Sequence, residues 1–103
     1  MTVTYPTSAV IFEWDDEKEI INKKKHSISF EDAIAVFYDE HPFRKYDEDH
    51  SDDEHRTFLI GRLRGHLLAV VIYTERYDRI RIISARLASK HEVRKYELRQ
   101  IRD

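Results

Sequence analysis

The feature that most constrains the fold is a run of three β-type segments in the second half of the chain. Residues 56–63 alternate apolar and polar side chains, residues 67–74 are almost continuously apolar, and residues 79–85 follow as a third segment. The links between them are Arg64-Gly65 and residues 75–78. Links this short join antiparallel neighbours, so the sequence predicts a three-stranded antiparallel meander.

Two helices are predicted ahead of these strands. Asp15 is a good N-cap for a helix over about residues 16–25, and Ser29 is an N-cap for a second helix that ends near Asp39. The first helix ends in a basic cluster, residues 23–26. Cations interact favourably with the free carbonyls at a helix C-terminus, so this cluster has a structural explanation as well as a functional one.

Three further elements complete the predicted order. Residues 11–14 alternate as a short strand does, residues 43–54 read as an edge strand that runs into an acidic loop, and a C-terminal helix follows. Ser89 and Glu92 form a capping box at the start of that helix. The order is a short strand, two helices, about four antiparallel strands and a last helix. It predicts an α+β fold with helices packed against one sheet.

A chain of 103 residues holds one domain. We expect residues 11–103 to form this domain. Residues 1–10 show no regular spacing of apolar side chains, and we expect them to be a flexible leader. The longest apolar runs, residues 33–38 and 67–73, are far shorter than the ~20 residues of a membrane span. The sequence therefore predicts a soluble, cytoplasmic protein that does not bind membranes.

Charge is divided between the two halves of the chain. Residues 1–54 carry 6 Lys/Arg and 15 Asp/Glu, whereas residues 55–102 carry 12 and 4. A basic half suits a polyanion such as RNA, and an acidic half can fold over it or meet a basic partner protein. The alternative is that the two halves neutralise each other within one fold.

The familiar catalytic signatures are absent. The sequence contains no Cys, and its two glycines, Gly61 and Gly65, form no phosphate-binding loop. His41, His50 and His55 lie among acidic residues, but their spacing matches no motif with fixed ligand geometry. We therefore predict no metal site and no cofactor.

The strand segments are rich in arginine. Arginine is permanently charged and forks onto phosphate oxygens, so it can hold a nucleic-acid backbone or stabilise charge at phosphorus. RNA carries its own nucleophile in the 2′-hydroxyl, so its cleavage requires cations, a base and an acid but no metal. Pairing of these arginines with carboxylates is the structural alternative. The arginines on or beside the strands are Arg56, Arg62, Arg64, Arg79, Arg81 and Arg86.

A set of spaced residues runs through residues 11–97. It comprises FEWD at 12–15 with Lys18 and Asn22, Lys25-His26, FEDA at 30–33, and above all RIISAR at 81–86 with Ala88, Glu92 and Tyr96. In these residues the chain resembles the BrnT family of type II toxin–antitoxin toxins. Ser27 departs from the pattern, since the family usually has Gly after the Lys-His pair.

The resemblance implies a RelE-like fold and a small ribonuclease that inhibits growth by cutting RNA. It also implies a cognate BrnA-type antitoxin that holds the toxin inactive and binds DNA, so that this chain would meet DNA only through its partner. By motif match, the resemblance implies as site residues Lys25, His26, Arg56, Arg81, Arg86, Glu92 and Tyr96.

Our first hypothesis is a metal-independent RNA endonuclease toxin. Arg56, Arg81 and Arg86 hold the phosphate and the charge of the transition state. His26 or Glu92 transfers protons. The residues expected to bind or position the RNA are Lys25, Arg62 and Tyr96.

Two alternatives belong to other classes of protein. One is a non-catalytic module that binds a partner protein and adjusts its DNA binding, with the arginines as an interface. The other is an RNA-binding regulator that does not cleave.

Strand parity raises a question about two of the arginines. Arg81 shares a side of its strand with Ile83, whereas Arg86 follows Ile82 and Ser84. The two arginines meet only if the strand bends or ends by residue 85. Arg86 could also have a structural role instead of a catalytic one, in which it pairs with an acid such as Glu92 and holds the last helix in place.

Overall fold

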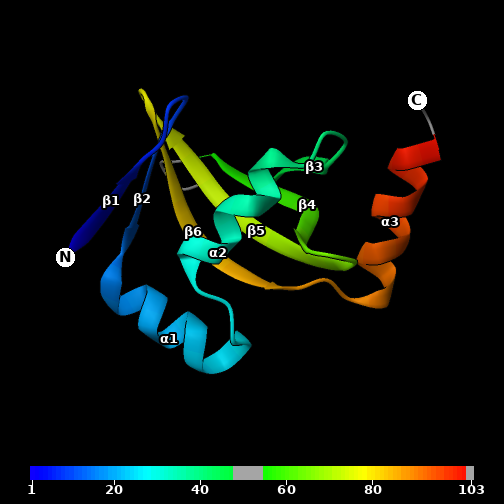
Figure 1. Ribbon diagram of the computed structural model, residues 1–103, viewed down its shortest axis with the longest axis horizontal. Coiled ribbons are helices and arrows are strands. Elements are labelled where there is room, and N and C mark those ends of the chain that lie inside the picture. Colours follow the sequence, from blue (N-terminus) through cyan, green and yellow to red (C-terminus); the bar gives the residue numbers. More distant parts are fainter. Residues whose placement is uncertain (48–54, 102–103) are drawn as a thin grey trace.

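One mixed sheet of six strands organises the computed structural model, which describes residues 1–47 and 55–101 (Figure 1). In Figure 1 the helices α2 and η1 cross one face of the sheet, and α3 lies at the right, away from β1 and β2. The elements in chain order are β1 (Thr2–Pro6), β2 (Ile11–Asp15), α1 (Asp16–His26), α2 (Phe30–Ala33), the 3₁₀ helix η1 (Ile34–Tyr38), β3 (Phe43–Asp47), β4 (Arg56–Arg64), β5 (Leu67–Arg76), β6 (Arg79–Leu87) and α3 (Lys90–Ile101).

The strand order is β1-β2-β6-β5-β4-β3. Strands β3 to β6 pair antiparallel in chain order. β2 lies parallel to β6, with Ile11–Glu13 beside Arg79–Arg81. The sheet thus has one more strand than expected, and it is mixed. β6 can lie parallel to β2 because the intervening chain, which includes α1, α2 and η1, is long enough to carry it back to the same end of the sheet.

The first residues differ from the flexible leader that we expected. Thr2–Pro6 form β1, which pairs antiparallel with β2, and Tyr5 stacks on Trp14 with ring centroids 6.2 Å apart. The Met1 amino group lies 3.0 Å from a carboxylate oxygen of Asp16. The β-branched residues of this segment favour a strand, but only the edge of β2 gives that strand a partner.

Helix α1 begins and ends where local chemistry directs it. The Asp15 carboxylate accepts hydrogen bonds from the amides of Glu17 at 2.9 Å and Lys18 at 3.4 Å. Ser27 closes the helix with φ of 61°, and its amide donates to the Lys23 carbonyl at 2.8 Å. This left-handed conformation favours glycine, which gives a physical reason for the glycine usual at this place in the family.

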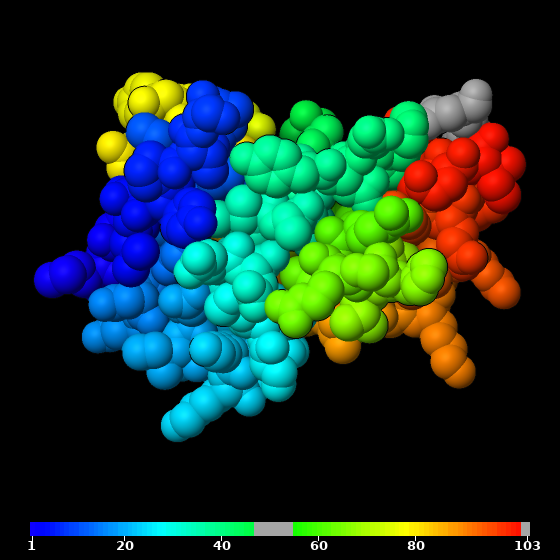
Figure 2. Space-filling model, in the orientation of Figure 1, coloured from blue at the N-terminus to red at the C-terminus, as the bar shows by residue number. Residues whose placement is uncertain are grey.

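The second predicted helix is divided into α2 and η1. Ser29 caps α2 by accepting a hydrogen bond from the Asp32 amide at 3.0 Å. η1 then packs so closely on β4 that a Cβ on Gly61 would lie 2.9 Å from both the Val36 carbonyl oxygen and its Cγ1. Gly61 is therefore required for this approach of the helix to the sheet. Figure 2 shows η1 (teal) lying against the end of β4 and the β4–β5 turn (light green).

The core has two layers, one on each face of the sheet. The larger layer packs α2 and η1 against residues such as Phe12, Leu59 and Val71. The smaller layer lies under α3, where Tyr96 packs on Ile60 and Val70. One face of the sheet is therefore covered by α2 and η1, while the other is covered by α3 at one end.

Candidate functional site

The second face of the sheet, beyond the part that α3 covers, is here called the open face. Strand register places side chains on it in rows that cross the strands. One row joins Arg56, Thr74, Arg81 and Glu13, on β4, β5, β6 and β2 respectively. We call Arg56, Thr74 and Arg81 the cationic row. Because neighbouring strands are about 4.8 Å apart, the two arginine Cα atoms are separated by roughly 10 Å, with Thr74 between them.

The two arginines of the cationic row differ in their partners. The Arg81 guanidinium lies 2.6 Å from a carboxylate oxygen of Glu13, whose side chain is 9% exposed. Arg79 lies 3.5 Å from the other oxygen of Glu13. Arg56 has no ion-pair partner among the side chains that the structure describes. The row therefore combines one guanidinium oriented by Glu13 with one that has no ion-pair partner among the described side chains.

A β-bulge brings Arg86 to the same face of the sheet as Arg81. Ile72 pairs with Ser84 and Tyr73 pairs with Ile82, so Ile83 is an extra residue in β6. The bulge shifts the parity of the strand, so Arg86, opposite Val70, lies on the same face of the sheet as Arg81, opposite Thr74, at the border between the open face and the part that α3 covers. This answers the parity question raised by the sequence.

Arg86 is engaged by Glu92. Its two terminal nitrogens donate to the two carboxylate oxygens of Glu92 at 2.7 and 2.8 Å, and the Ser89 amide donates to the same carboxylate at 2.8 Å. These bonds, with Arg86 foremost, lower the pKa of Glu92 to about 2. Such a carboxylate is a weak base. The pair links β6 to the first turn of α3, which is the structural alternative for Arg86.

Helix α1 forms the rim of the open face beyond the end of β2. The Asn22 side chain pairs with the edge of β6, donating to the Ala85 carbonyl at 2.8 Å and accepting from the Ala85 amide at 3.2 Å. Beside it, a pocket of about 250 Å³ is lined by α1 and by the bulged part of β6. Its lining residues are Lys18, Ile21, Asn22, Lys25, His26, Ile83 and Ser84. Since Ser84 occupies the next row after Arg81, Lys25 and His26 stand at the margin of the open face.

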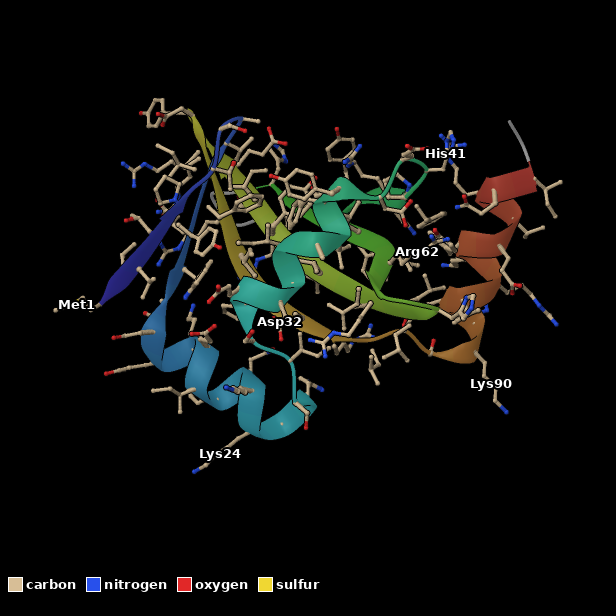
Figure 3. The ribbon with its side chains drawn as sticks, viewed as in Figure 1. Met1, Lys24, Asp32, His41, Arg62 and Lys90 are labelled. Atoms are coloured by element: carbon tan, nitrogen blue, oxygen red, sulfur yellow. The ribbon has the colours of Figure 1, made fainter. Side chains whose placement is uncertain are left out.

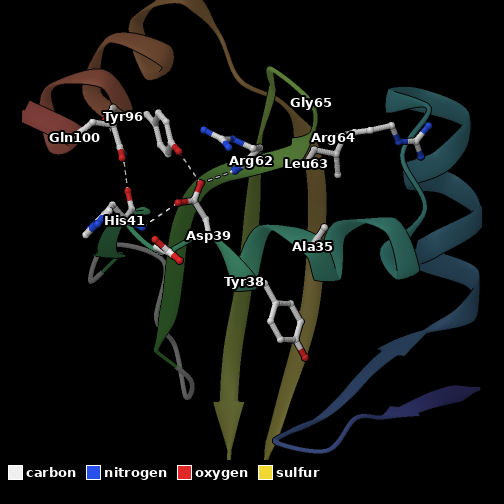
Figure 4. A pocket seen from close by; sticks show the side chains of 11 residues that line it. Ala35, Tyr38, Asp39, His41, Arg62, Leu63, Arg64, Gly65, Tyr96 and Gln100 are labelled. Atoms are coloured by element: carbon white, nitrogen blue, oxygen red, sulfur yellow. Dashed lines mark hydrogen bonds between the residues drawn. The ribbon is translucent and has the colours of Figure 1, made fainter.

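A larger cavity of about 500 Å³ lies at the far end of β4, between η1 and α3 (Figures 3 and 4). The Asp39 carboxylate there accepts hydrogen bonds from the Tyr96 hydroxyl at 2.7 Å, the Arg62 amide at 2.8 Å and the His41 amide at 2.9 Å. Burial opposes ionisation of Asp39, but these bonds outweigh it and lower the pKa of Asp39. Gln100 adds a bond from its amide to the His41 carbonyl at 2.6 Å. The cluster ties α3 to the end of η1.

The structure thus separates the predicted site residues into two groups. Arg56 and Arg81 share the open face with Arg86 and Glu92, and Lys25 and His26 lie at its rim. Arg62 and Tyr96 line the larger cavity instead, and Arg62 lies six positions after Arg56 in β4, about 20 Å along the strand.

Glu13 and Asn22 support the open face, and no sequence pattern predicts these roles. Glu13 alternates with Phe12 and Trp14 in β2, which marks it as facing away from the helices, but its arginine partners depend on the parallel register with β6.

The part of the chain that the structure describes contains neither a metal-binding cluster nor a membrane-spanning helix. No group of three or more His, Asp or Glu residues there is arranged to hold a metal ion. His50 and the acidic loop predicted around it fall within residues 48–54, outside the described residues. No helix in the same segments is long and apolar enough to span a bilayer.

Comparison with known proteins assigns the family. Residues 14–92 match the family model described as the ribonuclease toxin BrnT of type II toxin–antitoxin systems. The crystal structure of the Brucella abortus ribonuclease toxin BrnT superposes with a TM-score of 0.58 at 28% sequence identity, over 75% of this chain and 94% of that chain. No curated protein matches the chain. With a family match over most of its length and the same α+β architecture, the chain belongs to the BrnT family of ribonuclease toxins of type II toxin–antitoxin systems.

Proposed function

We propose that this protein is a metal-independent endoribonuclease toxin that cleaves RNA on its open face. The observation that carries the proposal is the cationic row, two guanidinium groups on either side of Thr74, with Lys25 and His26 at the adjacent rim. Family membership supports RNA as the substrate. The arrangement combines cations on the open face with a candidate proton-transferring group at its rim, and both are needed for RNA cleavage through its own 2′-hydroxyl.

In the proposed mechanism, the 2′-oxygen attacks the adjacent phosphorus and the bond from phosphorus to the 5′-oxygen breaks. Arg56 and Arg81 bind the non-bridging oxygens, where negative charge develops. Glu13 holds the guanidinium of Arg81 in place and is a positioning residue. The 2′-hydroxyl proton passes to a base, and an acid donates a proton to the departing 5′-oxygen. The products are a 2′,3′-cyclic phosphate and a 5′-hydroxyl.

His26 is the better candidate for proton transfer. Imidazole exchanges protons near neutral pH, whereas a carboxylate with a pKa of about 2 is a weak base. His26 also lines the rim pocket together with Lys25, which would contact the RNA backbone. In this proposal Arg86 and Glu92 form the border of the site at α3, and Arg62 and Tyr96 stabilise the fold rather than bind RNA.

The proposal extends to the cellular role. The protein would act in the cytoplasm and inhibit growth until a cognate BrnA-type antitoxin covers the open face. Contact with DNA would come only through that antitoxin. A partner that covers a cationic face presents acidic or mixed side chains to it.

The alternative is the non-catalytic module, and one observation favours it. Arg81 and Arg86, two of the three arginines predicted to hold phosphate, are already paired with Glu13 and Glu92. In that case the open face would be an interface for a partner protein, and RNA would remain intact.

The experiment that tests the proposal incubates purified protein with a defined RNA in excess EDTA and identifies the product ends. We expect cleavage to persist, with 2′,3′-cyclic phosphate or 3′-phosphate ends. Arg81→Ala and Arg56→Ala should each slow cleavage by roughly 10²–10³-fold, the cost of losing one transition-state donor. The matched control is Arg64→Ala, because Arg64 belongs to the same strand as Arg56 but pairs with Asp32 of α2.

Three results would count against the proposal. Activity that is lost on chelation and restored by Mg²⁺ refutes metal independence. Arg81→Ala and Arg56→Ala variants that fold and cleave at the wild-type rate remove the cationic row from the site. Intact RNA, with a folded protein that still binds its partner, supports the non-catalytic module.

A further inference from the structure

A row of apolar side chains runs beside the cationic row on the open face. Phe58 on β4 pairs with Ile72 on β5, and Ile72 pairs with Ser84 on β6. Both apolar side chains are partly exposed, unlike Ile60 and Val70 in the next row, which are buried under α3. We call Phe58 and Ile72 the apolar strip.

The spacing of the two rows follows from strand geometry. Phe58 lies two residues from Arg56, and Ile72 lies two residues from Thr74, so each strip residue is about 7 Å along its strand from the cationic row. The strip ends at Ser84, where the rim pocket adds the apolar side chains of Ile21 and Ile83.

Basic side chains lie in the rows on both sides of the strip, and two of them, Arg81 and Arg86, are paired with Glu13 and Glu92. Arg56 and Arg81 lie on one side of it, and Arg86 lies in the row on the other side. Lys45 of β3 pairs with Phe58 and extends the strip's own row. A nucleic-acid strand, with phosphates on one side and flat bases on the other, matches this alternation of cations and exposed apolar groups.

We propose that the open face binds single-stranded RNA laid across the strands, with phosphates on the cationic row and a base stacked on the ring of Phe58. This inference rests on the proposed function and specifies its substrate. Aromatic side chains stack on unpaired bases, whereas the bases of a duplex are stacked on one another and are not available. Phe58 is then a specificity-determining residue that selects unpaired RNA.

The test measures binding to an RNA that the protein has no means of cleaving. The probe is a 2′-O-methyl oligoribonucleotide, which lacks the nucleophile, used alone and annealed to its complement. A 2-aminopurine base in the probe reports stacking through its fluorescence. The variants are Phe58→Leu, which removes the ring, and Phe58→Tyr, which keeps it.

A matched control exists on the same pair of strands. Tyr46 is 68% exposed on β3 and lies opposite Thr57, so it points to the other face of the sheet. Tyr46→Leu removes an exposed aromatic ring without touching the strip. Thermal unfolding of each variant shows whether it is folded, and only folded variants are compared.

We expect the single strand to bind at least tenfold more tightly than the duplex. Phe58→Leu should weaken single-strand binding by roughly 5- to 100-fold and abolish the fluorescence change, as for the loss of one base–aromatic stack. Phe58→Tyr and Tyr46→Leu should bind as the wild type does.

Equal affinity for single strand and duplex, or unchanged binding by folded Phe58→Leu, overturns the inference. If RNA with free 2′-hydroxyls is still cleaved in that case, the proposed function stands without the strip. If the wild type neither binds nor cleaves RNA, both the proposed function and the inference fail.

Discussion

Replacing Glu92 with Gln tests how the last helix is held. Glu92 accepts two hydrogen bonds from Arg86 and one from the Ser89 amide, and its side chain is 12% exposed. Gln has nearly the same shape and retains an acceptor for Ser89, but it lacks the charge that binds the guanidinium. The substitution therefore removes the ion pair with little change in packing.

The magnitude follows from the pKa of Glu92. A carboxyl whose pKa falls from 4.5 to about 2 on folding contributes at most about 3 kcal/mol to the free energy of unfolding at neutral pH. Arg86 is 36% exposed, and solvent screening reduces this value. We expect Glu92→Gln to lower the free energy of unfolding by about 1–2 kcal/mol. The melting temperature should fall by roughly 5–10 °C.

The pH dependence of this difference has a defined sign. Because folding lowers the pKa of Glu92, the stabilisation is fully present above pH 4.5 and is lost as the pH falls towards 2. Urea unfolding of the wild type and Glu92→Gln between pH 7 and pH 2.5 measures the difference directly. A variant as stable as the wild type at pH 7, or a difference that stays constant down to pH 2.5, refutes the reasoning.

Other predictions concern the fold and the partner. Asn22→Leu leaves the buried amide and carbonyl of Ala85 unpaired and should lower the free energy of unfolding by about 1–3 kcal/mol. Gly61→Ala forces a Cβ against Val36 and should cost about 1–3 kcal/mol. Ser27→Gly relieves a left-handed conformation and should raise stability by about 0.5–1 kcal/mol. Urea unfolding measures all three, and a change of opposite sign contradicts the contact concerned. The antitoxin should bind more weakly at high salt and protect the open face from amide exchange, and protection confined to residues 1–54 would reject that surface.

The starts and ends of the helices could be predicted from the sequence because they depend on neighbouring residues. Asp15, Ser29 and the Ser89–Glu92 capping box act within about four residues, and each caps a helix in the structure. The second helix is the exception in its later part. Its continuation as η1 depends on close packing against Gly61, which local spacing does not reveal.

Part of the candidate site could be predicted for the same local reason. The arginines of β4 and β6 follow from composition and alternation. Glu92 is already the alternative partner of Arg86 that the sequence suggests, because the two residues are six positions apart. Glu13 could not be predicted as the partner of Arg81, because it reaches Arg81 only through the parallel register of β2 and β6. Residue type and motif predict Arg62 and Tyr96 as RNA-binding residues, whereas the contacts of Asp39 place them in a second cluster.

Residue types and caps determined the order of elements and an arginine-rich sheet. Tertiary structure decided which arginines share a face. An extra residue at Ile83 shifts the parity of β6, and whether a strand accommodates such a bulge depends on the strands beside it. The pairing of β1 and the parallel insertion of β2 also required a partner edge, formed by residues distant in sequence. Register is a property of two strands together, so no single segment specifies it.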